Sequence, residues 1–142
     1  MLRMIRLLPA IVAAALLTAC TGPQSITVEK GVELPDVLQS DGVNGESDPG
    51  AAWKGADRSS LVVVVYGSSS CAPGVVDLTV QSPRSLAVEF AQSTDEICSA
   101  DMAANTYRFD TPEGLATDGD VQLEMTFEYD GKKSTSTVTI LE

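Results

Sequence analysis

A run of hydroxyl and thiol side chains is the part of the sequence that most suggests chemistry. Ser68, Ser69 and Ser70 stand directly before Cys71, at the end of an apolar stretch. A serine nucleophile needs a base that takes its proton, usually a histidine or a lysine. The chain has no histidine, and no lysine follows a serine by three residues as in Ser-x-x-Lys enzymes. We therefore interpret these serines as a polar turn and as possible binding residues, and assign no catalytic residue.

Carboxylates are abundant, so acid–base catalysis and calcium binding need separate consideration. A glycosidase pair of carboxylates needs a cleft, and a single small domain is a poor candidate for one. The segment 41–48 alternates oxygen ligands but lacks one at Val43 and has no closing glutamate, which breaks the EF-hand spacing. Asp118 and Asp120 flank Gly119 as in a turn. We expect solvated acidic loops, no metal, no cofactor and no enzymatic activity.

The first 19 residues have the organisation of an export signal. Arg3 and Arg6 precede an almost wholly apolar run, Leu7–Leu17, and small residues follow it. This order is typical of a secretory signal. A membrane-spanning anchor is the competing interpretation, but the run is shorter than the roughly 20 residues that cross a bilayer, and Pro9 interrupts it. We predict a signal peptide over residues 1–19.

The end of this leader, Leu17-Thr18-Ala19-Cys20, resembles the lipobox of bacterial lipoprotein precursors. The resemblance implies that the chain is cut before Cys20 and that this cysteine carries lipid. Two or three acyl chains give a stable anchor where one does not, since each buried CH₂ contributes about 0.8 kcal/mol. An ordinary secreted protein with a stray cysteine is the alternative. We expect a protein anchored by lipid to the extracytoplasmic face of the cell membrane.

Lipidation of Cys20 leaves Cys71 and Cys98, which have one possible pairing. Outside the cytoplasm such a pair is expected to be oxidised. Closing a loop of this length stabilises a fold by roughly 3–4 kcal/mol on the chain-entropy model. A zinc site is the alternative, but two cysteines without histidine do not supply a tetrahedral set of ligands. We predict a disulfide.

Composition and charge limit the partners. The chain of 142 residues is 44% hydrophobic and 20% charged, which fits one globular domain. The formal charge is −11, and removing Arg3 and Arg6 with the leader leaves 7 basic against 20 acidic residues, a net −13. Such a chain offers no basic patch for nucleic acid, and anionic lipid repels it. The membrane is therefore expected to hold it through lipid alone.

Residues 20–50 are predicted to be the lipidated N-terminus and a flexible tether, because turn-forming pairs recur along them. Within this tether, Ile26–Val28 has the pattern of a short strand. The folded domain is predicted to span residues 51–142.

Apolar residues in the domain recur with the period of β-strands. Six segments have this pattern: Leu61–Tyr66, Val76–Val80, Leu86–Phe90, Tyr107–Phe109, Val121–Tyr129 and Ser134–Leu141. The first is apolar throughout, which suits a strand buried on both faces, and Asp130-Gly131 suits a tight hairpin turn. Ser93–Glu96 fits a capping box, so a short helix is expected near Cys98. We predict an all-β fold, a small antiparallel Ig-like sandwich with one disulfide, with an open barrel as the alternative.

Trp53 stands before the first long strand. An exposed tryptophan can anchor a ligand or partner, but a lone tryptophan in a small sandwich more often fills the core. We favour the core and retain Trp53 as a possible binding residue.

The domain also resembles a known group of proteins. Trp53, the turn Gly67–Pro73, Cys98 and the pair Thr106-Tyr107 are similar to features of uncharacterised exported lipoproteins of actinobacteria. The resemblance covers residues 51–142. It implies a Gram-positive, high-GC source and anchoring on the outer face of the plasma membrane, and it implies no activity.

These observations predict a non-catalytic binding or structural module of the cell envelope, with a protein or envelope partner. The alternative is an extracellular inhibitor or protector that presents the loop Gly67–Cys71. A binding module should expose an apolar or aromatic patch. An inhibitor should present a rigid, protruding loop pinned by the disulfide.

Overall fold

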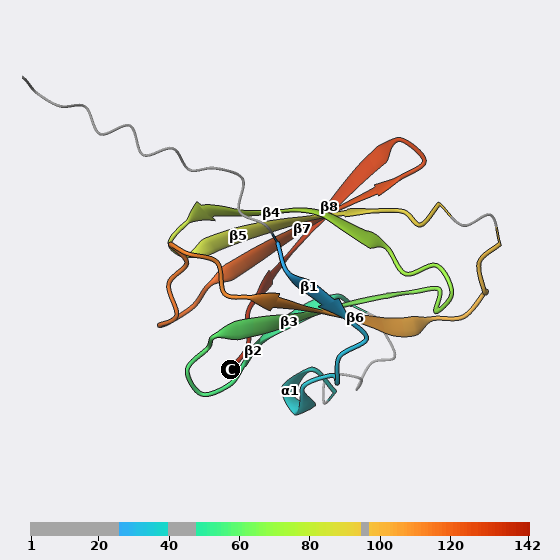
Figure 1. The fold of residues 1–142 in the computed structure, drawn as a ribbon. Helices are drawn as coiled ribbons and strands as arrows, with labels where there is room; N and C mark the ends of the chain where they lie inside the picture. The colour runs from blue at the N-terminus through green and yellow to red at the C-terminus, as the bar shows by residue number, and fades with distance from the viewer. Residues whose placement is uncertain (1–25, 40–47, 95–96) are drawn as a thin grey trace, which may run out of the picture.

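Two four-stranded sheets face each other in the computed structural model, which describes residues 26–39, 48–94 and 97–142 (Figure 1). Sheet A has the strand order β1-β6-β3-β2, and sheet B has the order β4-β5-β7-β8. The strands are β1 (Val28–Lys30), β2 (Gly50–Lys54), β3 (Ser60–Gly67), β4 (Gly74–Ser82), β5 (Ser85–Ala91), β6 (Ala103–Asp110), β7 (Gln122–Tyr129) and β8 (Lys132–Thr139). One short helix, α1 (Asp36–Gln39), lies among the described residues. The predicted all-β sandwich is confirmed.

The core lies between the sheets and follows the alternation of the sequence. Leu86, Val88 and Phe90 of β5 are buried and face sheet A, while the residues between them are only half-buried. Strand β7 contributes Leu123 and Met125 in the same way. Because one face of each strand is apolar, a shift of one residue in register would expose the whole set, and this fixes the pairing.

Strand β3 is buried on both faces, as its continuous apolar run predicted. Val63 belongs to the core, whereas Val62 and Val64 point to the opposite face and are still at most 2% exposed. Helix α1 lies close to this opposite face beside Gly50. A Cβ placed on Gly50 would lie 3.0 Å from Leu38 of α1 and 3.6 Å from Val64. Helix α1 therefore lies against the outer face of sheet A.

The structure accordingly places residues 26–39 on the sandwich, where the sequence had assigned them to the tether. Strand β1 pairs with β6 from Val28 to Lys30, and Thr106 donates a hydrogen bond from its hydroxyl to the carbonyl of Val32. The short strand expected at Ile26–Val28 thus begins at Val28. The surrounding sequence is rich in turn-forming residues, so the apolar contacts of Val28 and Leu38 could not be predicted from it.

One pair of neighbouring strands, β5 and β7, runs parallel within a sandwich that is otherwise antiparallel. The chain leaves β5, crosses to sheet A to form β6, and returns to sheet B as β7. Parallel neighbours need such a long crossover connection, which is usually a helix and here is a strand of the opposite sheet.

Strands β7 and β8 form the hairpin that Asp130-Gly131 predicted. Both turn residues have positive φ, +50° and +72°, the combination that a two-residue type I′ turn requires. The serine- and threonine-rich β8 is an edge strand, as expected. Beyond it, the N–H of Leu141 donates to the carbonyl of Ala51, and the N–H of Trp53 donates to the carbonyl of Leu141. These two bonds join the end of the chain to β2.

The helix expected near Cys98 is absent from the described residues around it, since 97–102 form no helix. Residues 95 and 96 of the proposed capping box lie outside the described ranges, as do Cys20, the leader and the segment 41–47. No described helix is long and apolar enough to cross a membrane.

Candidate functional site at the disulfide end

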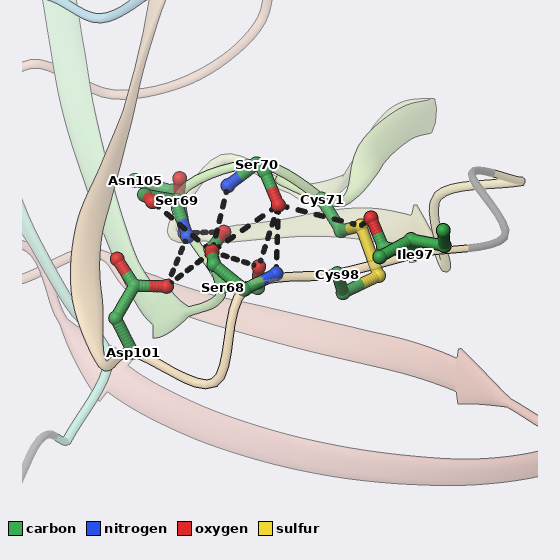
Figure 2. Close-up of a disulfide and its surroundings, with 9 residues drawn as sticks. Ser68, Ser69, Ser70, Cys71, Ile97, Cys98, Asp101 and Asn105 are labelled. Carbon is green, nitrogen blue, oxygen red and sulfur yellow. Dashed lines mark hydrogen bonds between the residues drawn. A yellow bond between two sulfur atoms is a disulfide. The ribbon is translucent and has the colours of Figure 1, made fainter.

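A disulfide joins the two connections that cross between the sheets at one end of the sandwich. Cys71 lies between β3 of sheet A and β4 of sheet B, and Cys98 lies between β5 and β6 (Figure 2). Their Cα atoms are 5.4 Å apart. The predicted pairing is confirmed, and it holds both crossovers against each other.

A network of hydroxyl groups next to the disulfide ties the same two loops (Figure 2). The Ser99 hydroxyl lies 2.8 Å from that of Ser68 and 3.2 Å from those of Ser69 and Ser70. The Ser99 N–H donates to the Ser70 hydroxyl at 2.8 Å. The polar turn predicted at residues 68–70 is therefore bonded to the loop that contains Cys98, and it leads into the disulfide.

Asp101 also belongs to this network. Its carboxylate accepts the N–H of Ser69 at 3.0 Å and the hydroxyl of Ser99. Hydrogen bonds from the Ser69 side chain, then the Ser99 side chain, then the Ser69 backbone hold the pKa of Asp101 well below its usual value. Each of these bonds favours the ionised carboxylate.

This arrangement is better suited to holding loops than to catalysis. A general base works best when its pKa is near the operating pH, and the pKa of Asp101 is shifted in the other direction. The hydroxyls of Ser68 and Ser70 are bonded to Ser99 and to each other. Their chemistry is that of a fixed polar surface.

An apolar pocket of about 290 Å³ opens beside the disulfide. Its lining comes from the ends of β5 and β7 and from the two crossover loops: Ser68, Cys71, Pro73, Phe90, Ala91, Gln92, Ser93, Cys98, Phe127, Glu128 and Tyr129. Of the serines predicted as possible binding residues, Ser68 lines this pocket, while Ser69 and Ser70 are exposed on the adjacent turn.

Stacked aromatic rings give the pocket a firm wall. The ring of Phe90 stacks on Phe127 with centroids 5.3 Å apart and meets Tyr107 edge to face at 5.2 Å. The Tyr107 hydroxyl donates to the carbonyl of Pro73 at 2.6 Å, which ties the wall to the Cys71 loop. A pocket of this size and lining can take one small apolar group, such as an aliphatic or aromatic side chain.

Large apolar side chains are exposed in the segments that form this end. Tyr129 is 66% exposed on the pocket rim, and Ile97, beside Cys98, is 88% exposed. Met102, just before β6, is also exposed. Sequence reasoning missed this surface, although Tyr129 could have signalled it as an aromatic residue directly before a turn.

Trp53 lies away from this surface. It pairs with Leu61 near the start of β3, whereas Cys71 follows the end of that strand. The indole is 7% exposed and belongs to the core, with the Arg58 guanidinium 5.8 Å from its ring centre. The interpretation of Trp53 as core filler is therefore confirmed.

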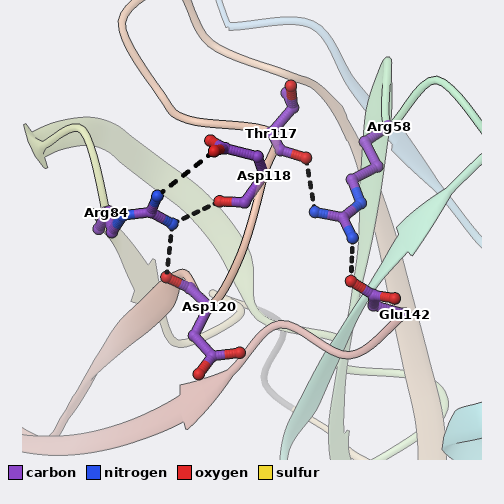
Figure 3. A network of polar contacts seen from close by, with 6 residues as sticks. All are labelled: Arg58, Arg84, Thr117, Asp118, Asp120 and Glu142. Carbon is purple, nitrogen blue, oxygen red and sulfur yellow. Dashed lines mark hydrogen bonds and ion pairs between the residues drawn. The ribbon is translucent and has the colours of Figure 1, made fainter.

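Two arginines hold the loop that contains Asp118 and Asp120 (Figure 3). Arg84 donates to the backbone carbonyls of both aspartates, and its guanidinium lies 3.6 Å from the Asp118 carboxylate. Arg58 donates to the carbonyl of Thr117 and pairs with Glu142. The Arg84 guanidinium thus contacts both backbone carbonyls of this turn and the carboxylate of Asp118. Within the described ranges, no three His, Cys, Asp or Glu side chains cluster as metal ligands.

Comparison of the chain with protein-family models, with curated proteins and with solved structures found no match.

Proposed function

We propose that this protein is a lipid-anchored, non-catalytic binding module on the extracytoplasmic face of the cell membrane. The observation that carries the proposal is the use of its cysteines. Cys71 and Cys98 are joined in the folded domain, and the third cysteine, Cys20, directly follows the predicted signal peptide in a lipobox-like sequence. A disulfide in the domain is consistent with an oxidising compartment.

The disulfide end supports binding as the activity. An apolar pocket opens between loops that are fixed by the disulfide and by the Ser99 network. Fixed loops lose little conformational entropy when a partner docks, so more of the contact energy remains as affinity. The exposed Tyr129 on the rim suits a partner that presents an apolar side chain.

The inhibitor alternative has one observation in its favour. The loop Gly67–Cys71 is pinned by the disulfide and by Asp101, as a rigid inhibitory loop should be. The two proposals differ in the surface they use. An inhibitor depends on the exposed Ser69 and Ser70, whereas the binding module depends on Phe127 and Tyr129.

The anchor is tested by intact mass and membrane partition of the chain expressed in an actinobacterial host. We expect a mature product that begins at Cys20, carries acyl chains and stays with the membrane, and a Cys20→Ser variant that lacks the lipid. A Cys71→Ser/Cys98→Ser double variant is the control, because it also replaces cysteines but should keep the lipid. An unmodified wild-type product would overturn the anchor.

The binding surface is tested by a photo-crosslinking residue placed at position 129 in the anchored protein. We expect crosslinks to an envelope component from this position and none from Lys54, an exposed control position on β2 beside Trp53. Crosslinks from Ser69 with none from 129 would favour the inhibitor instead.

A further inference from the structure

The two sheets have four edge strands, and three of them have features that hinder further pairing. Strand β1 has three residues, and β2 is bridged at Ala52 by Leu141. The ladder between β4 and β5 is interrupted at two places, and Asp77 is exposed on β4. Short strands, covered edges, bulges and charges are the usual devices that block edge-to-edge pairing. Strand β8 is charged only at Lys132 and Lys133, at its first end, and it pairs with β7 along eight residues without interruption.

The backbone groups that β8 presents to its open side can be identified from its neighbours. The N–H of Ile140 donates to Val121 beside β7, so the even-numbered residues face β7. The N–H of Leu141 donates away from β7, to Ala51 of β2, so the odd-numbered residues face outward. Lys133, Thr135 and Thr137 therefore point their N–H and C=O groups to the open edge. In the described part of the chain, no backbone hydrogen bond outside the β7–β8 ladder reaches 132–139.

We propose that β8 pairs antiparallel with β8 of a second copy of this chain, about a two-fold axis at Thr135. The outward residues 133, 135 and 137 are symmetric about this position. Thr135 then faces its own counterpart, and Lys133 faces Thr137 of the second copy, each pair exchanging two backbone hydrogen bonds. Opposed residues are all odd-numbered, so their side chains lie on one face, as antiparallel pairing requires.

Charge complementarity along the paired edges favours this register. Thr137 already pairs with Glu124 of β7, so each Lys133 would lie in one row with Thr137 and Glu124 of the other copy. In the single chain, the Lys133 ammonium is 3.8 Å from both Glu89 and Glu128. No lysine faces a lysine, and residues 134–141 carry no charge. The pairing also gives a closed dimer, because both copies use the same edge and neither leaves it open for a third copy.

The dimer is tested on the protein as its host produces it, whether lipidated or not, so the result does not depend on the proposed anchor. Amide hydrogen exchange is followed by NMR over a series of protein concentrations. We expect exchange at Lys133, Thr135 and Thr137 to slow as concentration rises, while Ser134 and Ser136 stay protected throughout. Sedimentation should show the mass doubling over the same range. Exchange at the odd-numbered amides that is independent of concentration would overturn the proposal.

Thr135→Pro and Thr135→Ala form a matched pair of variants. Proline removes the outward N–H at 135 and is tolerated on an edge strand where that group faces solvent. Both variants lose the 3.4 Å contact between the Thr135 and Thr126 hydroxyls, but alanine keeps the N–H. We expect loss of the dimer with proline only, with melting curves showing that both variants fold. Dimers that survive in Thr135→Pro would contradict the pairing, and so would a photo-crosslink from position 137 solely to a different protein.

Discussion

At the scale of single residues, Asp101 makes the stability of the disulfide end depend on pH. Its pKa is lowered in the folded protein by bonds from Ser69 and Ser99. A lowered folded pKa stabilises the fold above the unfolded value, and this contribution is lost as pH falls through the folded value. We therefore expect the wild type to lose stability below about pH 4. The Asp101→Asn variant should be less stable than the wild type at neutral pH, and its stability should change less as the pH falls. Thermal melts across this range measure both.

Glu113→Gln is the matched control for Asp101→Asn, since Glu113 is an exposed carboxylate outside the network. It should keep the wild-type dependence on pH. Parallel curves for Asp101→Asn and the wild type would show that Asp101 does not fix the turn.

Tyr107 is expected to make stability fall at alkaline pH, where Asp101 makes it fall in acid. Burial raises its pKa from 10.0 to about 12. The stabilisation is fully present below pH 10 and is lost as pH rises through about 12, because the unfolded chain ionises first. Tyr107→Phe should remove this alkaline loss. It should also cost about 1 kcal/mol at neutral pH, because the carbonyl of Pro73 loses its donor. Urea unfolding at neutral and alkaline pH measures both effects, and an unchanged alkaline loss would contradict the assignment.

The residues of the site were only partly predictable from sequence. Cys71 and Cys98 could be paired because few cysteines are present. Ser99 and Asp101 were missed because their partners at 69 and 70 are about 30 residues away, and no local pattern marks such a contact. Phe127 was placed on a strand, but its stacking on Phe90 depends on the pairing of β5 with β7.

At the scale of elements, the long strands could be predicted and the short ones could not. The alternation of β5 and β7 is strong because one face of each is apolar. Strand β2 has two alanines and one tryptophan, too few residues to show a period, and it is held partly by Leu141. The parallel pairing of β5 with β7 arises from the route through sheet A, and strand patterns carry no information about such a route.

The hairpin between β7 and β8 gives a prediction at this scale. A Cβ at Gly131 or at Gly74 would have open space, but only Gly131 has a positive φ, +72°. Gly131→Ala should therefore destabilise the fold by about 1–2 kcal/mol through backbone strain, while Gly74→Ala should be neutral or slightly stabilising. Denaturant unfolding measures the free energy of unfolding of both variants. Because neither added methyl group meets a neighbouring atom, the difference between them reports backbone strain alone. Equal effects would contradict the type I′ turn.

At the scale of the whole molecule, the end of the chain fastens one sheet to the other. Deleting residues 141–142 removes the two hydrogen bonds between Leu141 and β2. We expect a loss of about 2 kcal/mol in the free energy of unfolding, at about 1 kcal/mol for each bond. Deleting Glu142 alone removes only an ion pair whose carboxylate is exposed, and should cost less than about 1 kcal/mol. Similar losses from both deletions would show that the ion pair between Arg58 and Glu142, and not the Leu141 hydrogen bonds, provides the stabilisation.

The position of the disulfide has a consequence for the order in which the chain assembles. Among the described residues between Cys71 and Cys98, the strands are β4 and β5, which pair with each other. The covalent loop therefore encloses a complete local hairpin, whose closure does not wait for distant segments. The neighbouring β7 reaches β5 only after β6 has crossed to the other sheet, and non-local pairing of this kind is slow. Under oxidising conditions, the hairpin of β4 and β5 is thus expected to form first and to serve as the template on which the later strands dock.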